Sequence, residues 1–116
     1  MGIEKFEDII AWQKSKELSL AVYRTFGHSK DFGFRDQICR ASVSIMNNIA
    51  EGFDRRGDKE FAHFLSISKG SCGEVRSMLY LAFELKYISE TELAYMNNLS
   101  LEISKMLSSF IKKLKT

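Results

Sequence analysis

Short hydrogen-bonding side chains form a line along the segment between residues 34 and 53. They recur every three or four residues and are Gln37, Arg40, Ser44, Asn47, Asn48 and Glu51. This spacing puts all of them on one arc of a helix, where an ordinary solvated helix carries Lys, Glu and Ala. Because these groups donate and accept hydrogen bonds, we predict a hydrogen-bonded polar seam rather than a free surface.

The residue types needed for catalysis or metal binding do not converge in the sequence. His28 and His63 are isolated, and Glu60 with His63 is a lone fragment of a metal motif that has no counterpart in another helix. Cys39 and Cys72 lack CxxC spacing and are expected to be reduced, half-buried side chains. We therefore predict that the protein is not an enzyme and has no cofactor, no metal and no small-molecule substrate. An enzyme is the weakest of three hypotheses, and a metal bound by Glu60 and His63 would favour it.

Basic residues gather after the second predicted helix and near the end of the chain. They are Arg55, Arg56 and Lys59, followed by Lys105, Lys112, Lys113 and Lys115. These cations are the candidate contacts to phosphate or to a protein partner. The alternative is that the lysines only favour a helix macrodipole and that the arginines are solvated or paired with Asp54 and Asp58. A few such charges in one copy would bind nucleic acid weakly, whereas repeated copies in an oligomer would add.

The elements that must position these residues are helices. The 116-residue chain contains no proline and no run with strand alternation, so we predict an all-α fold. Polar and glycine-containing breaks leave helices near residues 7–26, 34–53, 58–87 and 90–114. The short connections predict one antiparallel up-down-up-down four-helix bundle over residues 1–116. Ser89 and Glu92 are spaced as a capping box for the fourth helix, and Asp58 is expected to cap the third.

Composition excludes several classes of protein. Hydrophobic residues make up 45% of the chain and charged residues 28%, with a formal net charge of +2. These are values of a globular domain rather than of a disordered or membrane protein. The apolar stretches are too short to span a bilayer and the N-terminus lacks a signal-peptide pattern, so we expect a cytoplasmic protein with no membrane partner.

The second predicted helix has an unusually wide apolar arc. One stripe consists of Phe34, Ile38, Ala41, Ile45 and Ile49. The other consists of Cys39, Val43, Met46, Ala50 and Phe53. Together the stripes span about half the circumference, more than the ~100° a surface helix of a bundle needs. We therefore expect this helix to be central or to face another subunit.

The third predicted helix carries a stripe of small residues away from its core side. Its members are Ser66, Gly70, Gly73 and Ser77. A helical glycine costs about 0.8–1 kcal/mol relative to alanine, so we predict that another helix packs closely on this small-residue stripe. The alternative is a local break of the helix near residues 70–73.

Three segments together resemble a known family. They are FEDIIAWQ near the N-terminus, SIMNNIAEG in the second helix, and RRGDKEFAHFLSISKGSCGE after it. The sequence resembles the four-helix-bundle proteins encoded in intervening sequences of bacterial large-subunit ribosomal RNA, often labelled ribosomal-protein-like, and the related accessory variability determinant of diversity-generating retroelements. The resemblance implies a homopentamer whose basic surfaces meet nucleic acid or a reverse transcriptase. Cys39 departs from the family pattern by replacing a basic residue, and Met46 departs by replacing a proline.

Two functional hypotheses follow. The first is a non-enzymatic homo-oligomeric accessory protein that binds RNA, or a partner that handles nucleic acid, through its basic surfaces. The second is a structural or adaptor oligomer that binds proteins only. Salt-dependent RNA binding would distinguish them, because phosphate contacts release counterions.

Overall fold

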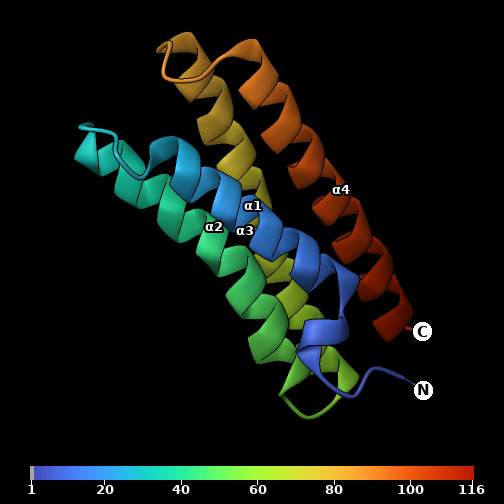
Figure 1. Ribbon diagram of the computed structural model, residues 1–116. Helices are drawn as coiled ribbons and strands as arrows, with labels where there is room; N and C mark the ends of the chain where they lie inside the picture. The colour runs from blue at the N-terminus through green and yellow to red at the C-terminus, as the bar shows by residue number, and fades with distance from the viewer. Residues whose placement is uncertain (1) are drawn as a thin grey trace.

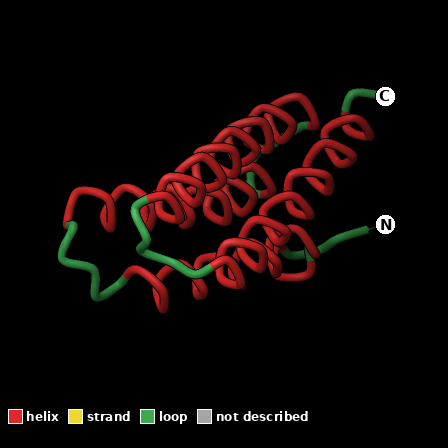
Figure 2. Tube along the Cα trace, turned by 90° about the horizontal axis from the view of Figure 1, so that it is seen from above, coloured by secondary structure: helices red, strands yellow, loops and turns green. Residues whose placement is uncertain are grey.

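Four long helices and one short 3-10 helix make up the fold. The computed structural model describes residues 2–116. The elements are η1 (Phe6–Asp8), α1 (Ile10–Phe26), α2 (Phe32–Phe53), α3 (Asp58–Glu84) and α4 (Glu90–Leu114). Residues 2–116 contain no strand (Figures 1 and 2), which confirms the all-α prediction.

The helices pack as an elongated bundle of 44 × 21 × 19 Å. Within the described residues, the backbones of α1 and α2, α2 and α3, α3 and α4, and α4 and α1 lie side by side, whereas those of the diagonal pairs do not. Short connections make successive helices antiparallel, so the predicted up-down-up-down bundle is confirmed. None of the helices in residues 2–116 combines the length and the apolarity needed to cross a bilayer.

Each helix contributes one apolar face to a common core. Leu18, Ile45, Leu65, Leu79 and Ile103 are fully buried there. Burying a side chain of this size stabilises the fold by roughly 1.5–3 kcal/mol. Aromatic contacts close the bundle at both ends. Phe26 and Phe34 with Tyr87 lie at one end, and Phe53 and Phe61 with Phe110 lie at the other.

The first helix begins later than residue 7, where the sequence predicted it. Ile9 has extended backbone angles (φ −75°, ψ 122°) and separates η1 from α1. Its side chain is buried, so the turn is held by packing. The bend also brings Phe6 against Trp12, with ring centroids 5.2 Å apart. The prediction of one continuous helix over 7–26 is therefore wrong at its start.

The third helix ends at Glu84, three residues before the predicted end. Lys86 has φ 64°, in the left-handed region. The Lys86 amide donates to the Phe83 carbonyl (2.9 Å) and the Tyr87 amide donates to the Ala82 carbonyl (2.8 Å). This is the Schellman pattern of helix termination, which usually has glycine at the left-handed position. Because lysine occupies that position here, sequence pattern alone could not place this end.

Side-chain caps set the starts of α2 and α4, and α2 begins at Phe32, two residues before its predicted start at residue 34. The Ser89–Glu92 capping box is present as predicted. Asp58 is not a cap, because Gly57 is the N-cap residue of α3 with φ 90° and Asp58 is the first helical residue. Asp31 caps α2 by accepting from the Phe34 amide, and its other oxygen accepts from the Tyr87 hydroxyl at 2.7 Å. The Tyr87 hydroxyl and the Phe34 amide hold the pKa of the Asp31 carboxyl below its usual value.

Both cysteines are free and buried rather than half-buried. The Cys72 thiol donates to the Ser100 carbonyl at 3.2 Å and so links α3 to α4. Burial raises the pKa of Cys72 to about 11 and also raises the pKa of Cys39. Both residues therefore act as small core side chains rather than as reactive thiols.

Candidate functional site

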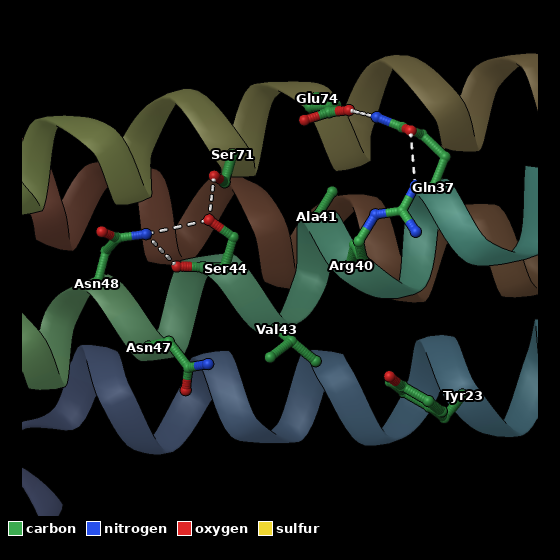
Figure 3. A pocket seen from close by; sticks show the side chains of 10 residues that line it. All are labelled: Tyr23, Gln37, Arg40, Ala41, Val43, Ser44, Asn47, Asn48, Ser71 and Glu74. Carbon is green, nitrogen blue, oxygen red and sulfur yellow. Dashed lines mark hydrogen bonds between the residues drawn. The ribbon is translucent and has the colours of Figure 1, made fainter.

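The polar seam lies on the side of α2 that borders α3, and α3 supplies two of its partners (Figure 3). The hydroxyls of Ser44 and Ser71 are 2.9 Å apart. Gln37 donates to Glu74 of α3, and Arg40 donates back to Gln37 at 3.3 Å. The bonds of Gln37 and Ser44 join α2 to α3 at two points about two turns apart.

The remaining seam residues bond within α2 or face solvent. Asn48 donates to the carbonyl and the hydroxyl of Ser44, at 2.8 and 3.0 Å. Glu51 pairs with Arg55 at 2.6 Å, one turn along the chain. Asn47 is exposed and its side chain makes no hydrogen bond to residues 2–116. The seam is therefore bonded on its α3 side and open on its outer side.

A shallow groove of about 580 Å³ follows the seam across α1, α2 and α3. Tyr23 of α1 forms one wall, and Val43 and the seam residue Asn47 lie on the side of α2 that faces α1. The Ser44 hydroxyl has only neutral partners there, Ser71 and Asn48, and neither can take its proton as a general base. The groove therefore offers a hydrogen-bonding surface rather than an activated nucleophile.

The two apolar stripes of α2 differ in how far one bundle buries them. The first stripe is buried in the core, and α2 contacts α1, α3 and η1. Val43, Met46, Ala50 and Phe53 of the second stripe are only half-buried. α2 is not central in the bundle, so that part of the expectation is wrong, and the expectation that the arc faces another subunit stays a prediction.

The small-residue stripe is open to solvent along an unbroken helix. α3 is continuous through residues 66–77, so the alternative of a local break is wrong. Ser66, Gly70, Gly73 and Ser77 are all exposed. A Cβ added at Gly70 or Gly73 would meet no described atom within 4 Å. Within residues 2–116 no helix packs on this stripe.

The close contact between α2 and α3 lies instead at Gly52 of α2, because a Cβ added there would lie only 2.6 Å from the Phe64 Cβ.

The fold brings the two basic clusters to the same end of the bundle. The α2–α3 connection and the last turns of α4 lie together at the lower end of Figure 1. Phe61 links them, because its ring packs on Phe53 and on Phe110, with centroids 6.0 and 5.1 Å apart. We call the cations at this end the cationic end, which consists of Arg55, Arg56, Lys59, Lys112, Lys113 and Lys115. The exposed carboxylates Asp54, Asp58 and Glu60 flank its first three members in the sequence.

Only Arg55 of the cationic end has a carboxylate partner in the described chain. It pairs with Glu51 and lies over the Phe64 ring, 5.1 Å from the centroid. The other five cations have no carboxylate within 4.0 Å in residues 2–116. Lys105 lies apart from this end, two turns before Lys112 on α4.

The candidate metal ligands His63 and Glu60 are exposed, and the described residues hold no cluster of potential metal ligands.

The sequence model of the 23S rRNA-intervening sequence protein family matches residues 7–109. The chain belongs to this family. A crystal structure of a protein with unknown function from the S23 ribosomal protein family of Bacteroides thetaiotaomicron has the same fold, with a TM-score of 0.82 and 30% sequence identity. The similarity covers 88% of this chain and 98% of that chain. No curated protein matches this chain.

Several residues that carry the 23S rRNA-intervening sequence resemblance lie at the contact between α2 and α3. Gly52 of NIAEG allows the close approach to Phe64, while Ser71 and Glu74 of GSCGE bond the polar seam. The resemblance marked these positions, but helical periodicity alone did not connect Ser71 or Glu74 with α2. Tyr23 was not predicted to line this groove, because the position of a tyrosine on an amphipathic helix does not indicate which groove its side chain borders.

Proposed function

We propose that this 23S rRNA-intervening sequence protein is a non-enzymatic, homo-oligomeric accessory protein that binds RNA through its cationic end. The observation that carries the proposal is the meeting of two basic clusters, distant in sequence, at one end of the bundle. The chain after Glu102 contains four lysines and no acidic residue, so nothing in that segment offsets their charge. Such a surface favours phosphate groups over neutral partners.

The names of the relatives suggest which RNA to test first. The family is named for an intervening sequence of 23S rRNA, and its structural relative is assigned to a ribosomal protein family. A hairpin of ribosomal RNA is therefore the natural probe. The homo-oligomer is part of the proposal because a few cations in one copy give weak binding, whereas repeated copies act together. The family resemblance implies five copies.

Fluorescence anisotropy with a labelled RNA hairpin tests the proposal. We expect the R55Q/R56Q/K59Q variant to bind at least about tenfold more weakly, and its plot of log affinity against log salt to be shallower by about 2. The matched control R24Q/K30Q/K86Q removes three cations away from the cationic end and should bind like the unmodified protein. Absence of binding at low salt, or equal losses in both variants, would overturn the RNA proposal.

A protein-only adaptor is the second candidate, and the open face of α3 favours it. Besides the exposed glycines of the small-residue stripe, Ile67 and Leu81 are 40% and 50% exposed on this helix. Glycine lowers the stability of a helix, and close packing of a helix from another chain on these glycines would offset that loss. Normal oligomer mass together with no RNA binding at low salt would favour this candidate.

A further inference from the structure

A second surface with phosphate-binding chemistry runs between α3 and α4. Two adjoining hollows, of about 560 and 500 Å³, share Lys69 and Ser108 and so form one shallow α3–α4 groove. Gly70 opens its α3 side because it has no side chain. Ser104 and Lys105 line its α4 side. None of the lining residues is acidic.

The polar groups of this groove are free to meet a ligand. Lys69 and Lys105 have no carboxylate within 4.0 Å in the described chain. The hydroxyls of Ser104 and Ser108 make no hydrogen bond to residues 2–116, whereas the buried Ser100 on the same helix donates to the Met96 carbonyl. Ammonium groups and hydroxyls in one groove match the non-bridging oxygens of a phosphodiester.

The α3–α4 groove has no aromatic side chain for base recognition. No aromatic residue lines it, so an RNA base would find no ring on which to stack. Its lining residues on α4 run from Leu101 to Ile111, about 15 Å at 1.5 Å per residue, which is long enough for more than one phosphate. Its last lining residue on α4, Ile111, directly precedes Lys112 of the cationic end in the sequence. Contacts here would hold the backbone without selecting sequence.

We propose that the α3–α4 groove binds the sugar–phosphate backbone of an RNA strand, independently of base sequence, and extends the path that begins at the cationic end. This inference rests on the proposed RNA-binding function. It adds Lys69, which lies in a separate part of the sequence from the basic clusters, and it assigns Lys105 to the groove rather than to the end of the bundle.

The test compares two substitutions in the groove with a matched control. K69Q/K105Q should weaken binding of oligouridylate and oligoadenylate equally, about fivefold to tenfold, and make the salt slope shallower by about 1.4, or 0.7 per single-strand phosphate. S104A/S108A keeps both charges, so we expect weaker binding with an unchanged slope. K30Q/K86Q loses the same charge at the other end of the bundle and should leave affinity unchanged.

Amide chemical shifts locate the contact independently. Titration of the labelled protein with oligouridylate should shift the amides of Gly70, Ser104 and Ser108, whereas polyglutamate of equal charge should not. Equal shifts with polyglutamate would make this a site for acidic protein and overturn the inference. Full affinity of K69Q/K105Q, with loss in R55Q/R56Q/K59Q, would overturn the groove alone. Absence of RNA binding by the unmodified protein would overturn both proposals.

Discussion

At the scale of single residues, Lys86 stores strain that a glycine would release. Its left-handed backbone (φ 64°) ends α3 and costs a residue with a Cβ roughly 1–2 kcal/mol, while glycine offsets part of this by its greater freedom in the unfolded chain. We expect Lys86→Gly to raise the free energy of unfolding by about 0.5–1 kcal/mol, measured by urea unfolding at fixed protein concentration. Lys86→Ala keeps the Cβ and should give no gain. Equal gains in both variants would show that the lysine charge, not the backbone, is responsible.

Lys86 also shows which helix ends cannot be predicted from the sequence. Ser89 with Glu92 could be predicted as a capping box because both partners are local and chemically distinctive. The end of α3 could not, because lysine at a left-handed position is set by the packing of Tyr87 beyond it rather than by its own preference. The prediction that Asp58 caps α3 was wrong because Gly57, the residue before it, has the non-helical backbone of the N-cap position.

At the scale of elements, the contact between α2 and α3 depends on one glycine, and the small-residue stripe does not contribute to it. Gly52→Ala would place a Cβ 2.6 Å from the Phe64 Cβ, so the helices must separate, and we expect a loss of about 1–3 kcal/mol in urea unfolding. Gly70→Ala meets open space and should gain up to about 1 kcal/mol from helix propensity. A loss of stability and of assembly mass in Gly70→Ala would instead reveal a neighbouring chain packed on α3.

Helical periodicity predicted which arcs are special but not which neighbour each one meets. The first apolar stripe of α2 contained buried residues as predicted, whereas most of the second stripe is half-buried, and the width of the two stripes together did not tell which neighbour covers the second. The polar seam had the right residues as well, but its partners Ser71 and Glu74 come from packing between helices. Lys69 went unnoticed because a lone lysine acquires meaning only beside the serines of α4.

At the scale of the whole molecule, the fold separates the bundle into chemically different ends and sides. The cationic end and the α3–α4 groove carry unpaired cations. The α1–α2–α3 groove carries polar groups of both charges, with Arg40 and Glu74 both bonded to Gln37, and the outer face of α3 carries small and apolar residues. The α3–α4 groove and the outer face of α3 share Ser66 and Gly70, so RNA in this groove and a second copy packed on the small-residue stripe would compete for the same part of α3.

The homo-oligomer proposal predicts the mass and the melting behaviour of the protein. Light scattering should give a multiple of the chain mass, and five copies if the family resemblance holds. Because association stabilises only the folded chain, the melting temperature should rise with protein concentration. RNA affinity should fall when dilution dissociates the oligomer, since the cationic ends then act singly. A monomer mass with a concentration-independent melting temperature would contradict the proposal. RNA binding would then rest on the few cations of one bundle.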